Sequence, residues 1–231
     1  MKKESEGFTL LELLIVITIV AILSVALVFI LNPSETLQKS RDTQRLADLS
    51  TLKMALGIYL SATSSPILDG GTNTFCVGGS GAPTIWYSSD QTTAGGSITF
   101  PGTPPTGFTG GAFVQRATAA ASSPVDGTGW VPVKLNGLIG GSPISSIPVD
   151  PINKIVINGS TLAVITNSAL TYRYACRKSP LSFEINARLE SATYGPGGTD
   201  DKSAKDGGNN PNLYETGNDL TILPSQASNN F

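Results

Sequence analysis

Residues 6–23 read EGFTLLELLIVITIVAIL, and the organisation of the whole chain follows from this stretch. Residues 13–31 carry no charge, and about 20 apolar residues in a helix span the ~30 Å hydrocarbon layer of a membrane. The length of the run and its lack of helix breakers favour a helix over a strand, although isoleucine and valine are abundant. Glu12 stands out near the start, because an acid costs about 2.5–3.5 kcal/mol at the centre of a membrane span. The stretch therefore predicts a membrane helix with one unexplained charge.

Three simpler kinds of segment also contain long apolar runs. A buried helix of a soluble protein agrees poorly with this one, because the run is apolar on all sides and too long. A secretory signal would use the small-x-small site at residues 24–26, but cleavage there would leave the apolar residues 27–31 exposed. A plain single-span membrane anchor agrees with the run and stays open at this point.

The composition of the chain excludes several classes of function. The chain has 231 residues, of which 40% are hydrophobic and 14% charged, so it has room for one ordinary domain beside the membrane helix. Its net charge of −2 provides no basic surface for nucleic acid. Histidine is absent, and this excludes a serine–histidine triad, a cysteine–histidine pair and a histidine-ligated zinc site.

A second helix is predicted directly after the apolar run, over residues 32–60. Asn32 can cap it, Pro33 suits its first position, and Glu35 stands at the capping-box position. Apolar residues then recur every three or four positions and form one stripe that packs on a following domain. The residues of this stripe are Leu46, Leu49, Leu52, Leu56 and Tyr59 or Leu60. The charged residues expected to face water are Arg41, Asp42, Arg45 and Asp48.

The rest of the chain predicts loops and an antiparallel sheet. Residues 63–129 are rich in glycine, serine, threonine and proline, which indicates loops with short strands around TFCV, TIWYSS and SITF. KIVI and STLAVIT flank Asn158-Gly159, a pair that favours a β-hairpin turn. LTYRYAC and LSFEINARL alternate in polarity, which predicts two strands with one buried face. The residues expected on their other face are Arg173, Ala175, Glu184, Asn186 and Arg188.

Cys76 and Cys176 are the two cysteines of the chain. Two thiols without histidine cannot build the usual four-ligand zinc site. They are therefore either two buried free thiols or a disulfide, and a disulfide requires an oxidising compartment.

The tail, residues 193–231, is rich in glycine, asparagine and aspartate. Asp200, Asp201 and Asp206 could offer oxygen ligands to calcium, which prefers such ligands. Their spacing is not that of an EF-hand loop, and clusters of this kind are common in plain surface loops. No other metal or cofactor is expected.

The residues Gly7-Phe8-Thr9-Leu10-Leu11-Glu12 closely resemble the processing signal of type IV prepilins and of the related pseudopilins of type II secretion. In that family a membrane prepilin peptidase cuts a short basic leader after a glycine, and the new N-terminal residue is N-methylated. The resemblance implies that Gly7 ends the leader, that Phe8 becomes the methylated N-terminus, and that Glu12 is the glutamate at the fifth mature position. The family fold is a long N-terminal helix packed on an antiparallel sheet, which agrees with the predicted α+β class.

The resemblance also implies an organisation and a life cycle for the chain. The expected segments are a leader (1–7), a transmembrane assembly helix (8–31), an amphipathic helix (32–62), a sheet domain (63–192) and a polar tail (193–231). The precursor would be a single-pass protein of the inner or cytoplasmic membrane, in contact with lipid and with its domain outside. It would then join an extracellular or periplasmic filament through contacts with itself and with a membrane assembly platform.

Glu12 acquires a physical role under this interpretation. Cleavage leaves a protonatable amine at Phe8, about 6 Å along the helix from Glu12. In a staggered bundle, Glu12 of one subunit can meet the amine of its neighbour, which removes the cost of burying each charge alone. The main prediction is a non-enzymatic filament subunit of the type IV pilus kind. The alternatives are a type II secretion pseudopilin, a membrane-anchored binding or adhesion module, and an exported enzyme.

Overall fold

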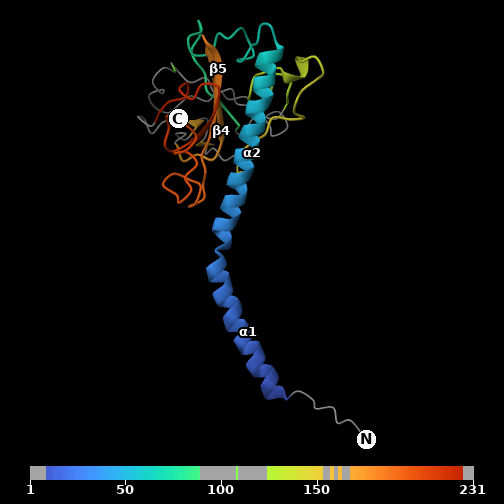
Figure 1. Ribbon diagram of the computed structural model, residues 1–231, viewed down its shortest axis with the longest axis vertical. Coiled ribbons are helices and arrows are strands. Elements are labelled where there is room, and N and C mark those ends of the chain that lie inside the picture. Colours follow the sequence, from blue (N-terminus) through green and yellow to red (C-terminus); the bar gives the residue numbers. More distant parts are fainter. Residues whose placement is uncertain are drawn as a thin grey trace. The chain divides into compact units, whose positions relative to one another are not determined.

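The computed structural model describes residues 9–88, 108, 124–152, 157–158, 161–162 and 167–225. The chain divides into two compact units, Met1–Gln38 and Lys39–Phe231. The first unit contains an apolar helix, and the second contains a four-stranded antiparallel sheet (Figure 1). The predicted α+β class is therefore confirmed.

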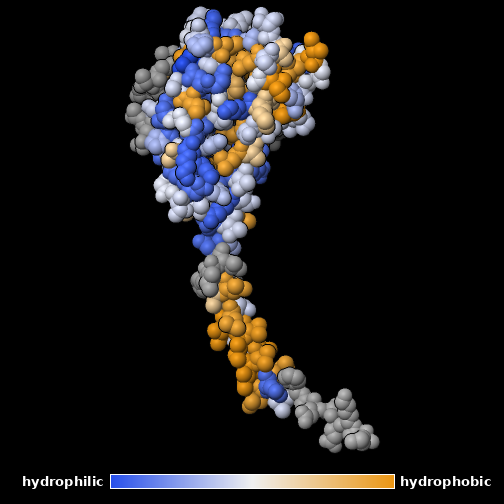
Figure 2. Space-filling view, viewed as in Figure 1, coloured by the Kyte–Doolittle hydropathy of each residue, from blue (hydrophilic) through white to orange (hydrophobic). Residues whose placement is uncertain are grey.

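The helix of the first unit, α1, spans Leu10–Leu31. Thr9 caps its first turn, and Asn32 ends it with a φ of 39°, in the left-handed region that asparagine tolerates. The side chains of residues 10–27 are all exposed, and Figure 2 shows an almost continuous hydrophobic surface along this helix. Within the part of the chain that the structure describes, α1 alone is long and apolar enough to cross a membrane, over Leu10–Leu27. Such a surface needs lipid or another apolar partner to cover it.

Helix α2 spans Pro33–Ala62, and most of it belongs to the second unit. The members of the predicted apolar stripe that are buried in the core are Leu49, Leu52, Leu56 and Tyr59. The prediction that Asp42 and Arg45 face water is wrong, because both are completely buried. The helical period of 3.6 places Arg45 and Asp42, four and seven residues before Leu49, on the same face as the buried leucines of the stripe.

The sheet of the second unit has the strand order β1-β4-β5-β6, and neighbouring strands are antiparallel. The strands are β1 (Trp86–Tyr87), β4 (Tyr172–Lys178), β5 (Leu181–Ala187) and β6 (Tyr214–Gly217). Strands β4 and β5 are the two that alternation predicts. β2 (Ile157–Asn158) pairs with β3 (Thr161–Leu162) in a separate two-stranded antiparallel sheet, and a short 3-10 helix spans Leu135–Gly137. Gly159 and the predicted SITF strand, residues 97–100, lie outside the described residues.

One face of the sheet packs on α2 and forms the main core (Figure 1). Trp86 packs against Tyr174 with ring centroids 5.6 Å apart, and Trp130 packs against Tyr172 at 6.1 Å. The indole N–H of Trp130 donates to the backbone carbonyl of Pro148 at 2.9 Å. Large aromatic side chains with satisfied polar atoms are efficient core formers, because each buries much apolar surface at little polar cost.

The other face of the sheet is also buried, which corrects the prediction that each strand has only one buried face. Arg173, Glu184 and Asn186 are completely inaccessible to solvent. Apolar side chains from distant parts of the sequence lie on this face: Phe108, Leu213, Ile222 and Leu223. Alternation of polarity along a strand cannot distinguish a face in water from a face under a second layer that binds polar groups.

Cys76 and Cys176 form a disulfide, with their Cα atoms 4.7 Å apart. Both are buried, and the bond joins the chain before β1 to strand β4. Backbone hydrogen bonds continue this connection, because Val77 donates to the carbonyl of Cys176 at 2.8 Å and Lys178 donates to the carbonyl of Val77 at 2.9 Å. The structure therefore contains the disulfide and not two free thiols.

The full-length protein purified without reductant is expected to contain no free thiol, because its two cysteines are both in this bond. Denaturation, alkylation and mass spectrometry measure this: alkyl groups should be added only after reduction. A Cys76→Ser variant is the control, since it leaves a reactive thiol at Cys176. Alkylation of both cysteines in unreduced wild-type protein would contradict the bond.

Candidate processing and assembly site

The expected cleavage site, Gly7-Phe8, lies outside the described residues, and the described chain begins at Thr9. Helix α1 begins at the next residue, so Glu12 lies in the first helical turn. Glu12 is exposed, and it is the one charged residue in the sequence of α1. The structure thus places the acid at the end of the apolar helix and not in its middle.

Thr9 and Glu12 form a capping box at the start of α1. The backbone N–H of Glu12 donates to Thr9 Oγ1 at 3.3 Å, and the backbone N–H of Thr9 donates to Glu12 Oε2 at 3.4 Å. Two N–H groups that a helix start leaves without partners are bonded in this way, and the carboxylate lies near the positive end of the helix dipole. Glu12 thus has a local role in the isolated helix, and the spacing Thr-x-x-Glu is the sequence signal that indicates it.

The hydroxyl groups of α1 are satisfied within the helix. Thr18 Oγ1 donates to the carbonyl of Ile15, and Ser24 Oγ donates to the carbonyl of Val20, both at 2.7 Å. Hydrocarbon offers no water to bind a hydroxyl group, so a hydroxyl is tolerated there only when it is hydrogen-bonded within the protein, as these two are. Glu12 therefore carries the one charge of the helix that needs a counter-charge when water is removed.

Residues 2–28 match the family model described as the prokaryotic N-terminal methylation motif. The chain carries the type IV pilin and pseudopilin signal. This pilin-type signal implies processing by prepilin peptidase and supports a precursor that is anchored in a membrane by α1. Neither the curated proteins nor the solved structures compared with the chain gave a match. The second unit is therefore interpreted from its own geometry.

A buried ion cluster connects α2 to two distant loops of the second unit. This group, the Arg45 cluster, consists of Arg41, Asp42, Arg45, Asp150 and Glu190. Arg45 Nε donates to Asp150 Oδ2 at 2.6 Å, and its Nη1 donates to Asp42 Oδ1 at 2.8 Å and to Glu190 Oε1 at 2.7 Å. Arg41 donates to both oxygens of Glu190, at 2.6 and 2.8 Å. One arginine side chain thus holds three carboxylates from three separate segments.

The Arg45 cluster compensates for the burial of its charges. Burial lowers the pKa of Arg45, but hydrogen bonds with Asp150, Glu190 and Asp42 outweigh this effect, so its pKa is raised. The hydrogen bond from Arg41 is the largest cause of the lowered pKa of Glu190. Asp42 also accepts the backbone N–H groups of Glu190 and Ser191, at 3.0 and 2.8 Å. Each buried charge therefore depends on the others for its partners.

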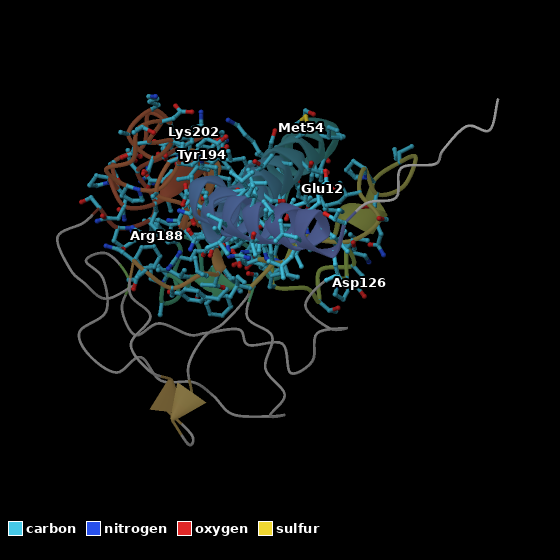
Figure 3. The ribbon with its side chains drawn as sticks, turned by 90° about the horizontal axis from the view of Figure 1, so that it is seen from below. Glu12, Met54, Asp126, Arg188, Tyr194 and Lys202 are labelled. Carbon is cyan, nitrogen blue, oxygen red and sulfur yellow. A yellow bond between two sulfur atoms is a disulfide. The ribbon has the colours of Figure 1, made fainter. Side chains whose placement is uncertain are left out.

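Asp200, one of the candidate calcium ligands, forms ion pairs with two lysines. Lys202 Nζ donates to it at 2.5 Å and Lys205 Nζ at 2.7 Å, and the hydrogen bond from Lys202 is the largest cause that lowers the pKa of Asp200 to about 2. The same ammonium group of Lys202 lies 5.3 Å from the ring centroid of Tyr194 (Figure 3). The carboxylate charge is therefore balanced by side chains of the tail itself.

The other two candidates bind the backbone of the tail. Asp201 accepts the N–H groups of Gly197 and Ala204 at 2.7 and 3.1 Å, and Asp206 accepts the N–H of Glu215 at 2.7 Å. Within the described ranges, no group of three or more acidic, cysteine or histidine side chains could hold a metal ion. No metal ligand is assigned from this geometry, and calcium binding by the tail stays a prediction.

Proposed function

We propose that the chain is the precursor of a structural subunit of a type IV pilus-like filament. The match of residues 2–28 to the methylation motif is the observation that carries this proposal. Prepilin peptidase cuts after Gly7, Phe8 becomes the N-methylated N-terminus, and the mature subunit polymerises through α1. The inner or cytoplasmic membrane holds the precursor, and a membrane assembly platform adds it to the filament.

The exposed apolar surface of α1 supports polymerisation through this helix. In the membrane, lipid covers that surface. Once the helix leaves lipid, the same surface has to be covered by equivalent helices of other subunits, because exposure of apolar area to water is unfavourable. Packing of isoleucine, valine and leucine side chains then supplies the attraction between subunits.

Glu12 supports a defined axial register between subunits. The amine that cleavage creates at Phe8 is a counter-charge available near the same end of the helix. Pairing across neighbouring subunits removes the cost of two separate buried charges, whereas a shift in register leaves both of them unpaired. In the isolated subunit the carboxylate caps α1, so the same side chain has a role before assembly as well.

The second unit is proposed to be a non-enzymatic domain that faces the outside. The disulfide agrees with an oxidising compartment, and the absence of histidine removes the commonest general base. The Arg45 cluster holds α2 against this domain, so that movement of the helix moves the domain with it. The proposed segments of the precursor are 1–7, 8–31, 32–62, 63–192 and 193–231.

A type II secretion pseudopilin is the second candidate, because the same motif occurs in both kinds of precursor. Long surface fibres that contain the protein would favour the pilus. Short fibres confined to the periplasm would favour the secretion system. Electron microscopy with labelling of the protein distinguishes the two.

The cleavage step is tested by mass spectrometry of the N-terminus. In cells with an active prepilin peptidase, the mature chain is expected to begin at N-methylated Phe8. Gly7→Leu is the matched control, because a large side chain at the cut should leave the leader attached and the methyl group absent. A wild-type chain that still begins at Met1 in those cells would refute the proposed function.

A further inference from the structure

Two glutamates lie together on the face of the sheet turned away from α2. Glu184 on β5 and Glu215 on β6 are 0% and 1% exposed. Asn186 is directly opposite Glu215 across the two strands, and Glu184 is two residues before Asn186. Residues two apart on a strand share a face, so all three side chains leave the sheet on the same side. Glu184 and Glu215 are therefore diagonal neighbours, a separation that long side chains bridge.

One oxygen of each carboxyl group binds the backbone. Glu184 Oε2 accepts the N–H groups of Ile222 and Leu223, both at 2.8 Å. Glu215 Oε2 accepts the N–H of Asn210 at 2.9 Å. The remaining oxygens, Glu184 Oε1 and Glu215 Oε1, are buried and have no hydrogen-bond donor in the described part of the chain. An unsatisfied buried oxygen is costly, and two of them on neighbouring carboxyl groups need a physical cause.

Two carboxylates that share a buried site cannot both be ionised, because repulsion between the charges adds to the cost of burial. We propose that Glu184 and Glu215 hold one proton between their Oε1 atoms, and that its release to solvent loosens the C-terminal segment from β5. With the proton bound, one carboxyl group donates an O–H···O hydrogen bond to the other, which satisfies both oxygens. After release, two negative charges face each other beneath Ile222 and Leu223.

The direction of the pKa shifts agrees with this geometry. Burial is the largest cause that raises the pKa of Glu184, and the neighbouring Glu215 raises it further. Burial raises the pKa of Glu215 as well. An unfolded chain releases these protons near the usual glutamate pKa of about 4.3, so the folded chain binds an extra proton at neutral pH. The stability that this proton supplies is complete below about pH 4.3 and falls as the pH rises toward the raised pKa.

Other titratable groups lie on the elements around the pair. They are Tyr87 on β1, Arg173 and Arg177 on β4, Arg188 after β5, Asp206 before β6 and Asp219 after β6. The guanidinium of Arg173 donates to two backbone carbonyls at 3.2 and 3.3 Å, and Arg177 pairs with Asp219. Asp206 accepts the N–H of Glu215 and adds a further negative charge beside the pair. The charge of Asp206 raises the pKa of Glu215 and so favours its protonated state.

Glu184→Gln tests the proposal, because glutamine can accept the two N–H groups and donate its own N–H to Glu215 without a proton from solvent. The full-length protein is unfolded by urea in detergent micelles, and the fluorescence of the buried Trp86 and Trp130 reports unfolding. From about pH 6 to about pH 8, the unfolding constant of the wild type relative to this variant is expected to rise about tenfold per pH unit. A ratio that does not change with pH would overturn the proposal.

Glu190→Gln is the matched control, since it removes a glutamate whose pKa is lowered. A lowered pKa contributes stability that is lost only as the pH falls through the acidic range. The ratio of the wild-type unfolding constant to that of Glu190→Gln should therefore stay constant from about pH 6 to about pH 8.

Infrared spectroscopy supplies a second measurement that needs no variant to be stable. Wild-type protein near neutral pH is expected to show a protonated carboxylic acid band, and its absence would also overturn the proposal.

Hydrogen exchange tests the effect on the C-terminal segment. At each pH the wild type and Glu184→Gln are compared, so that the intrinsic pH dependence of exchange cancels. The N–H groups of Ile222 and Leu223 are expected to exchange faster in the wild type, by a factor that grows with pH. Equal exchange at all pH values would contradict the loosening of this segment.

Discussion

Cells that produce Glu12→Ala instead of the wild-type chain are expected to cut and methylate the precursor normally and to assemble almost no filaments. Without Glu12, the amine of the neighbouring subunit loses its counter-charge inside the helical bundle. An unpaired charge in an apolar surrounding costs about 2.5–3.5 kcal/mol, or roughly a hundredfold in the equilibrium constant for each added subunit. Electron microscopy and the amount of protein in the sheared filament fraction measure the loss. Wild-type filament yield from this variant would refute the pairing.

Glu12→Gln separates the two roles of this side chain. A glutamine still accepts the N–H of Thr9 and keeps the capping box, but it carries no charge. If the counter-charge is what assembly needs, both variants lose filaments to a similar extent. If helix capping is what matters, Glu12→Gln assembles normally and Glu12→Ala does not. N-terminal mass spectrometry of both variants shows that processing is unaffected.

Arg45→Ala is expected to destabilise the second unit by about 3–5 kcal/mol, because it leaves buried carboxylates without their counter-charge. Asp42 and Asp150 are 0% and 2% exposed, and water cannot replace the lost guanidinium without opening the contact between α2 and the domain. Urea unfolding of the full-length protein, followed by tryptophan fluorescence, measures the change in the free energy of unfolding. Substitution of Arg45 is also expected to lower the free energy of unfolding more than substitution of any exposed charged residue of α2.

Arg41→Ala is the matched control for Arg45. Both arginines donate to Glu190, but the side chain of Arg41 is 30% exposed and that of Arg45 is completely buried. A partly exposed ion pair contributes about 0–1 kcal/mol, since water solvates the partner that remains. Equal losses from the two substitutions would show that burial of the charge does not govern the stability of the cluster.

The two helices of the N-terminal third could be predicted from local pattern, but the burial of Asp42 and Arg45 could not. The apolar run, the cap at residues 32–35 and the stripe from Leu46 to Tyr59 depend on residues at most a few turns apart. The capping box of Thr9 and Glu12 follows the same local rule, because its two residues are three positions apart. Alternation likewise predicted β4 and β5, because the period of a strand is a property of adjacent residues.

The environment of the charged residues could not be predicted in this way. Arg45 and Asp150 are 105 residues apart, and Arg45 and Glu190 are 145 apart, so nothing in the local sequence indicates that they meet. Glu184 and Asn186 occupy positions typical of a solvated strand face, yet distant segments cover them. A polar residue on an amphipathic pattern is compatible with water or with a buried partner, and only the fold distinguishes the two.

The positions of α1, α2, β4 and β5, the membrane-length apolar run and the pilin-type signal are encoded in the order of residues along the chain, because each depends on near neighbours. Strand β6, in the segment expected to be a polar tail, was not predicted. The partners of Arg45 and the burial of Glu184 beside Glu215 depend on which distant segments the fold brings together. The tertiary structure also places Cys76 beside Cys176, and so decides that they form a disulfide and are not two free thiols. The physical reason is the same in each case: the state of a charge or a thiol is set by the atoms around it in space.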